Sequence, residues 1–248
     1  MDMSGFGVSV FHGFTSTPAS MRALADALQG AGFTVDLPLL PGHGTSWEQL
    51  ATTSRSEIMR AALASYDRLA ARCPRVATVG LSMGGSLALH VAAHRRVEAV
   101  SVINPGLRLA PLTGPKAWAM GRIRPSVASI AGDIAKPDVV EEAYAQTPLR
   151  AVVELDRLFA QVRRELPELA RRRTPVLLFR SSVDNVLPPS SAETLSRLLR
   201  ADQLETVELT RSQHVATLDH EAETIHEQLI SFLHRRHLAA ETLERKAP

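Results

Sequence analysis

A serine flanked by glycines is the strongest chemical signal in the sequence. Gly80-Leu81-Ser82-Met83-Gly84 follows an apolar run, Val76–Gly80, and precedes a stretch of small residues with helical character. A Gly-x-Ser-x-Gly segment at a strand-to-helix turn is typical of a nucleophile elbow, in which the glycines relieve crowding and the serine hydroxyl stands at the helix N-terminus. The alternative is a plain glycine-rich turn. The elbow interpretation predicts that Ser82 is a nucleophile.

A serine hydroxyl is a weak nucleophile, so the sequence must also supply a base and a group that orients it. Asp184 follows the apolar run Pro175–Arg180, and His214 follows the run Leu204–Leu209. Both positions are loops at the ends of predicted strands, where catalytic groups gather in open α/β sheets. The order serine, acid, histidine is the order that an elbow predicts. The alternatives are a turn-forming aspartate and a polar surface histidine.

An oxyanion formed at Ser82 needs two backbone N–H donors. We expect one from Met83, directly after the serine. The other is expected from Phe14, because His12-Gly13-Phe14-Thr15 follows the first predicted strand and its glycine allows the chain to turn over the elbow. His12 and His43 both lie in glycine-bearing loops, and we interpret them as structural.

The elements that must position these residues alternate between apolar runs and helical patterns. The runs lack strict polar alternation, which favours strands buried on both faces of a parallel sheet. Predicted strands are Val8–Phe11, Phe33–Leu37, Val76–Gly80, Val97–Ile103, Pro175–Arg180 and Leu204–Leu209. Five helices are predicted. The first begins at Thr17 and Pro18, and the second carries the apolar stripe Ile58, Ala62, Tyr66 and Leu69. The other three span Ser82–His94, Ser190–Leu199 and Glu221–Leu233. This alternation predicts a doubly wound, mostly parallel α/β sheet.

The alternation stops between Asn104 and Arg173. This segment is rich in proline and contains no predicted strand, and its best helix runs from Pro148 to Leu169. We therefore predict an α/β core made of residues 1–104 and 173–248. Residues 105–172 are predicted to form a small helical cap, inserted before the last two strands and not an independent domain.

Composition excludes several classes of protein. The chain has 248 residues, 45% of them hydrophobic and 22% charged, which is the composition of an ordinary globular domain rather than a disordered or collagen-like one. The net charge is only +2, with acidic and basic residues interspersed, so no nucleic-acid partner is predicted. No run reaches the roughly 18 apolar residues of a membrane span, so no stable membrane insertion is expected.

Other features of the sequence set the expected compartment and cofactors. Cys73 is the single cysteine, so no intramolecular disulfide is expected, and the first residues lack the pattern of a secretion signal. We expect a cytoplasmic protein. Phosphate-binding loops, dinucleotide fingerprints and metal-ligand clusters are not apparent, so we predict no cofactor and no metal.

Together these segments resemble the α/β-hydrolase superfamily, and within it the small bacterial carboxylesterases and monoacylglycerol lipases with a short cap. The matching stretches, which run from residue 12 to the last predicted helix, are HGFTSTPASM (12–21), LPGHGT (40–45), GLSMGG (80–85), QTP (146–148), SSVDNVLPPSSA (181–192) and SQHVATLDHE (212–221). The resemblance implies Ser82, Asp184 and His214 as a catalytic triad, with Phe14 and Met83 as oxyanion donors.

The resemblance also implies that the cap covers an acyl pocket. Counted back from QTP, Ile130 and Glu141 fall where relatives contact the glycerol group; ordinary cap packing and a solvated helix charge are the alternatives for these two residues.

The sequence thus predicts a serine hydrolase that cleaves small carboxylic esters with short to medium acyl chains through an acyl-serine intermediate. Three alternatives remain at this point. One is an acyltransferase or thioesterase on the same fold, one is a ligand-binding protein that has lost turnover, and one is an interfacial lipase acting on long triglycerides.

Overall fold

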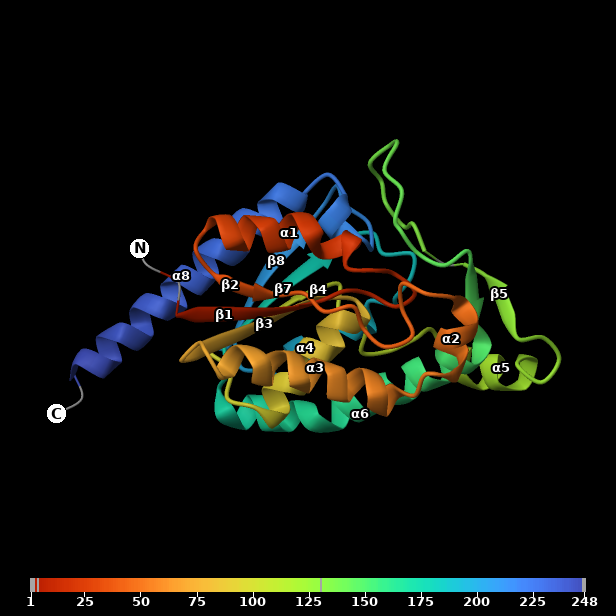
Figure 1. The fold of residues 1–248 in the computed structure, drawn as a ribbon, viewed down its shortest axis with the longest axis horizontal. Helices are drawn as coiled ribbons and strands as arrows, with labels where there is room; N and C mark the ends of the chain where they lie inside the picture. Colours follow the sequence, from red (N-terminus) through yellow and green to blue (C-terminus); the bar gives the residue numbers. More distant parts are fainter. Residues whose placement is uncertain (1–2, 4, 130, 247–248) are drawn as a thin grey trace.

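A parallel six-stranded sheet forms the centre of the computed structural model, which describes residue 3, residues 5–129 and residues 131–246 (Figure 1). The strand order is β2-β1-β3-β4-β7-β8, and every pair in it is parallel. The predicted parallel α/β sheet is therefore confirmed. The strands are β1 (Phe6–Phe11), β2 (Thr34–Asp36), β3 (Arg75–Leu81), β4 (Val100–Ile103), β7 (Val176–Ser181) and β8 (Leu204–Leu209).

Helices cover both faces of this sheet. One face carries α1 (Ala19–Gly30) and α8 (Ala222–Lys246), and the other carries α3 (Arg55–Ala70), α4 (Met83–His94) and α6 (Leu149–Arg172) (Figure 1). A further helix, α7 (Ser190–Leu198), packs beside α6. α8 continues past Leu233, where the predicted apolar pattern ends, to Lys246. Among the described residues, no helix is both long and apolar enough to cross a membrane.

Two hydrophobic cores, one on each side of the sheet, explain why the strands show no polar alternation. Leu178 of β7 packs in the core beneath α4 and α6, whereas its neighbours Leu177 and Phe179 pack in the core beneath α1 and α8. Successive side chains of a strand point to opposite faces. Because both faces of β1 and β4 are buried, all their positions are apolar or small, whereas β8, at the edge of the sheet, carries Glu205 and Glu208 at positions that are not buried.

The segment between Asn104 and Arg173 contains two short strands at one end of the sheet, so the prediction for this segment was wrong in one respect. This segment was predicted to contain no strand, but β5 (Ser126–Ala128) and β6 (Gln146–Pro148) pair antiparallel. Strands of three residues are too short to show any hydrophobic period, so the pattern could not reveal them. With α2 (Trp47–Thr52) and α5 (Thr113–Met120) they lie beyond one end of the sheet (Figure 1).

The long helix α6 belongs to both the inserted segment and the main core. At its start, Leu149 and Val152 pack with Ala117 of α5. Farther along, Leu158, Phe159, Val162, Leu166 and Leu169 are buried in the core that α4 shares. The limits of a cap at residues 105 and 172 stay a prediction. Because the second half of α6 is buried in the main core, only the part of the inserted segment before the middle of α6 could move as a cap.

Candidate active site

The turn between β3 and α4 holds Ser82 in a backbone conformation that few residues adopt. Ser82 has φ 56° and ψ −118°, a strained geometry for a side chain with a Cβ atom. The flanking glycines make the turn possible, because a Cβ at Gly80 would collide with the carbonyl of Gly84, and one at Gly84 would collide with the carbonyl of Phe11. The Gly-x-Ser-x-Gly spacing is thus required by close backbone contacts at this elbow.

The structure brings Ser82, His214 and Asp184 into one hydrogen-bonded chain. The His214 Nε2 atom lies 2.9 Å from the Ser82 Oγ atom, and the His214 Nδ1 atom lies 2.8 Å from the Asp184 Oδ2 atom. With its Nδ1–H donated to the carboxylate, the imidazole presents Nε2 as the acceptor for the serine proton. Ser82 and His214 are buried. This arrangement can activate a serine for nucleophilic attack.

Two backbone amides fix Asp184, and His214 does most to keep it ionised. Its Oδ1 atom accepts hydrogen bonds from the N–H groups of Val186 at 2.9 Å and Leu187 at 2.8 Å. Burial by itself raises the pKa of Asp184, but the hydrogen bond and charge of His214 together with the two amides outweigh it, and the net effect lowers the pKa. The carboxylate is therefore negatively charged at neutral pH, as an imidazolium partner requires.

The two residues expected as oxyanion donors belong to segments that lie close to Ser82. Met83 is the first residue of α4, and the first amides of a helix have no partner within the helix. The loop of Gly13 and Phe14 passes close to the elbow, since a Cβ on Gly13 would lie 3.6 Å from the Ser82 Cβ atom. The structure therefore places Met83 next to the nucleophile and the loop of Gly13 and Phe14 close to it, and the oxyanion role of Phe14 and Met83 stays a prediction.

A cavity of about 390 Å³ opens at Ser82 and His214. This volume lies toward the small end of the roughly 300–1,000 Å³ of ligand pockets. Its walls come mainly from apolar side chains of the inserted segment and of the loops at the sheet edge, namely Phe14, Leu109, Ala117, Met120, Val127, Leu149, Val152, Leu155, Phe159, Val186 and Leu187. Such a wall suits an alkyl or acyl chain.

Of the two residues expected to contact a glycerol group, the structure describes only Glu141. Glu141 lines the cavity and its Oε2 atom accepts a hydrogen bond of 2.9 Å from the backbone N–H of Gly132. The backbone contact orders the carboxylate in a cavity whose lining also includes the polar residues Thr113, Lys116 and Thr147. Ile130 lies outside the described residues.

Asp133 is a site residue that no motif or spacing in the sequence indicates. Its side chain accepts hydrogen bonds from the backbone N–H of His214 at 3.1 Å, and from the backbone and side-chain N–H groups of Asn185 at 3.0 Å and 2.7 Å. Its carbonyl accepts a further bond of 3.1 Å from Val215. Asp133 therefore joins the inserted segment to both catalytic loops.

Two more buried polar side chains hold the loop of His214. The Asn104 side-chain amide donates to the carbonyls of Gln213 at 3.3 Å and His214 at 2.8 Å. Asp219 accepts from the backbone amides of Gln213, Ala135 and Lys136 at 2.8, 2.7 and 2.9 Å. Asp219 stands in the SQHVATLDHE stretch, which was the available sequence signal, whereas nothing in the sequence marked Asn104.

His12 and His43 brace the loops beside the elbow. His12 donates from Nδ1 to the carbonyl of Gly13 at 3.0 Å, and its Nε2 accepts from the backbone N–H of Leu40 at 3.2 Å. Burial and the neighbouring His43 lower the pKa of His12 to about 3, and burial lowers that of His43 to about 4. Both rings are therefore neutral at physiological pH, and the structural interpretation fits their contacts.

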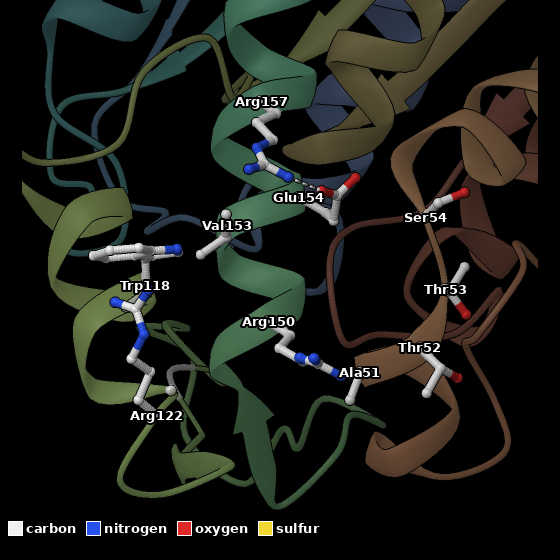
Figure 2. A pocket seen from close by; sticks show the side chains of 12 residues that line it. Ala51, Thr52, Thr53, Ser54, Trp118, Arg122, Arg150, Val153, Glu154 and Arg157 are labelled. Atoms are coloured by element: carbon white, nitrogen blue, oxygen red, sulfur yellow. Dashed lines mark hydrogen bonds and ion pairs between the residues drawn. The ribbon is translucent and has the colours of Figure 1, made fainter.

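A second hollow of about 620 Å³ lies on the outer side of α5 and α6. Figure 2 shows Trp118 and Arg122 on one wall, Arg150, Glu154 and Arg157 in the middle, and the chain from Ala51 to Ser54 opposite. The Arg122 guanidinium lies 3.4 Å from the centroid of the Trp118 ring, and Arg157 pairs with Glu154 at 2.6 Å. None of the triad side chains lines this hollow, so the chemistry belongs to the smaller apolar cavity.

Comparisons with known proteins agree with this geometry. A thermostable monoacylglycerol lipase from Bacillus sp. (strain H-257) is 37% identical over 227 residues, covering 91% of this chain and 89% of the lipase. A carboxylesterase from Bacillus subtilis (strain 168) is 24% identical over 238 residues, covering 92% of each chain. A solved structure from work on two metagenome-derived lipolytic enzymes, LipS and LipT, has a TM-score of 0.87 and 33% identity, covering 94% of this chain and 95% of the other.

A family model supports the same assignment over most of the chain. Residues 10–227 match the model described as "Alpha/beta hydrolase family". This range contains the elbow, the acid loop and the histidine loop. The expected superfamily is thereby confirmed, and the chain belongs to the alpha/beta hydrolase family.

Proposed function

We propose that the protein hydrolyses carboxylic esters of the monoacylglycerol-lipase and carboxylesterase type. One observation carries the proposal: the Ser82–His214–Asp184 hydrogen-bond chain opens directly on an apolar cavity large enough for an acyl chain. Relatives named as a monoacylglycerol lipase and a carboxylesterase support the same class of substrate. The preferred substrates are small esters with short to medium acyl chains, glyceryl monoesters among them.

The first half of the reaction forms an acyl-serine. The Ser82 Oγ atom attacks the ester carbonyl carbon while His214 Nε2 takes the hydroxyl proton. The carbonyl oxygen becomes an oxyanion, which the backbone N–H groups of Phe14 and Met83 stabilise. The carbon–oxygen bond to the alcohol then breaks, and the imidazolium returns its proton to the departing alkoxide.

The second half releases the acid. A water molecule gives its proton to His214 Nε2 and attacks the acyl carbon, and the bond to Ser82 breaks as the serine oxygen regains the proton. Asp184 stabilises the imidazolium in both halves through the bond to Nδ1. In a glyceryl monoester, the acyl chain lies against the apolar wall, and the carboxylate of Glu141 accepts hydrogen bonds from the glycerol hydroxyls.

A substrate profile tests this proposal. We would measure kcat/KM for monoacylglycerols and p-nitrophenyl esters of rising chain length, and for matched thioesters, with and without alcohol acceptors. The expected result is preferred hydrolysis of oxygen esters, with an optimum at short to medium length and with water as the acceptor. Asp184→Asn should lower kcat by about 10⁴-fold, because the imidazole loses its charged partner and correct tautomer. Preference for thioesters, or transfer to alcohols in place of hydrolysis, would contradict the proposal.

A further inference from the structure

A cluster of three potential metal ligands lies between α4 and α6, separate from the ester site. His90 and His94 are four residues apart on α4, and Glu165 faces them from α6. One ligand atom from each residue lies within 4.8 Å of the others. The sequence predicted no metal site, because Glu165 lies 75 positions from His90 and only the packing of the two helices brings them together.

Both histidines point to the same carboxylate. The His90 Nδ1 atom lies 2.7 Å from Glu165 Oε2, and the His94 Nε2 atom lies 3.3 Å from Glu165 Oε1. In a tetrahedral zinc site with bonds of about 2.0–2.1 Å, ligand atoms are roughly 3.3 Å apart. The His94–Glu165 separation is close to this value and the His90–Glu165 separation is shorter, but the two involve different carboxylate oxygens. Because one ligand atom of each residue lies within 4.8 Å of the others, side-chain adjustment can bring all three around one ion.

Two of the three ligands are ordered by burial, and the third is open to solvent. The side chains of His90 and Glu165 are 5% and 15% exposed, whereas that of His94 is 45% exposed. Gln161 also donates to Glu165 Oε1 at 3.1 Å and orients the carboxylate. Two ligands are therefore held in place before an ion arrives, and the third lies where the ion would enter.

The nearby arginines do not occupy the Glu165 carboxylate. Arg95 pairs with Asp67 at 2.7 Å, and Arg172 pairs with Glu168 at 2.6 Å. Their positive charges are therefore offset by other carboxylates. Two imidazoles and one carboxylate form a donor set that suits Zn²⁺ and similar transition-metal ions rather than Ca²⁺ or Mg²⁺.

We propose that His90, His94 and Glu165 bind one Zn²⁺-type divalent ion that joins α4 to α6. The ion replaces the proton that now lies between His90 and Glu165, and this proton moves to His90 Nε2 or is released to solvent. Water completes the coordination. α4 begins directly after Ser82, and His90 and His94 lie eight and twelve residues beyond it, so the metal is roughly 12–18 Å along the helix from the nucleophile. The ion is thus a stabilising link rather than part of ester cleavage.

Metal titration tests the proposal. Protein stripped with a chelator would be titrated with Zn²⁺ by calorimetry, and with Co²⁺ while its visible absorption is followed. We expect one ion per chain, a Co²⁺ spectrum typical of low coordination number with nitrogen and oxygen ligands, and a Tm that rises with Zn²⁺ concentration. The rate of ester hydrolysis should change less than about twofold between stripped and loaded protein.

Variants assign the site. His94→Ala removes an exposed ligand with little risk to the fold, and should weaken Zn²⁺ binding at least about tenfold and abolish the Tm rise. Glu165→Gln should do the same, and His220→Ala, which alters an exposed histidine outside the cluster, should bind Zn²⁺ like the wild type. If the wild type does not bind Zn²⁺, the cluster is an ion pair only. Unchanged stoichiometry and affinity in His94→Ala would place the ion elsewhere. Either outcome overturns the proposal.

Discussion

The Asp133 Oδ2 atom accepts a hydrogen bond of 3.1 Å from the backbone N–H of His214, although the two residues are 81 positions apart. The same carboxylate holds Asn185, the residue after Asp184. One side chain of the inserted segment therefore fixes the spacing between the loops that carry the acid and the base. Asp133 is a positioning residue, since it acts through the backbone of those loops.

Removing this carboxylate should impair catalysis more than binding. We expect Asp133→Ala to lower kcat by about 10- to 100-fold, because small misplacement of a base has effects of this size. KM should change little, since Asp133 does not line the cavity. Steady-state kinetics on a soluble p-nitrophenyl ester would measure both. Glu142→Ala is the matched control, because Glu142 is an exposed acid of the same segment. Equal effects of the two variants would argue against a positioning role.

The neutral histidines His12 and His43 should make stability depend on pH. Their folded-state pKa values are about 3 and about 4, whereas an unfolded histidine has a pKa of 6.5. Below pH 6.5 the unfolded chain binds more protons, so this part of the stability is complete above pH 6.5 and is lost as the pH falls. Uptake of one proton by each histidine on unfolding lowers the unfolding free energy by up to about 2.7 kcal/mol for each unit by which the pH falls.

Substituting one of these histidines separates its effect from that of the carboxylates. In His43→Phe the slope of unfolding free energy against pH should be shallower by up to about 1.4 kcal/mol per unit between pH 6 and pH 4.5. Urea unfolding of both proteins at several pH values gives this difference directly. Parallel curves would show that His43 protonates equally well in the folded protein.

The glycines of the elbow should differ sharply from a glycine on the surface of the fold. Gly84→Ala places a methyl group against the carbonyl of Phe11, and we expect a loss of about 3 kcal/mol in unfolding free energy. A Cβ at Gly30, at the end of α1, has no neighbour within 4 Å, so Gly30→Ala should change stability by less than about 1 kcal/mol. Thermal or urea unfolding compares them. A stable Gly84→Ala would contradict the close contact.

Glu141 should affect glyceryl esters selectively. If its carboxylate accepts hydrogen bonds from glycerol, Glu141→Ala should raise KM for monoacylglycerols by about tenfold, the equivalent of one or two hydrogen bonds. KM for p-nitrophenyl esters, which lack the glycerol hydroxyls, should stay nearly constant. A parallel rise for both substrates would instead indicate a general change in the cavity.

The sequence predicts those parts of the site that depend on local spacing and chain order. The elbow could be predicted because the glycines and Ser82 lie within five residues, and the loops of Asp184 and His214 because each follows a recognisable strand. Asp133 could not, because its partners, the backbone amide and side chain of Asn185 and the backbone amide of His214, lie 52 and 81 positions away and leave no mark on the sequence. The strands β5 and β6 were missed since three residues show no period.

The identity of the nucleophile is most directly tested by intact-mass spectrometry after reaction with a fluorophosphonate. The hydrogen-bond chain from Ser82 through His214 to Asp184 predicts one adduct per wild-type chain, located on the peptide that contains Ser82. It also predicts no adduct and at least about a 10⁴-fold loss of kcat in Ser82→Ala, which should remain folded. An adduct on another residue, or Ser82→Ala that still hydrolyses esters at the wild-type rate, would contradict the account.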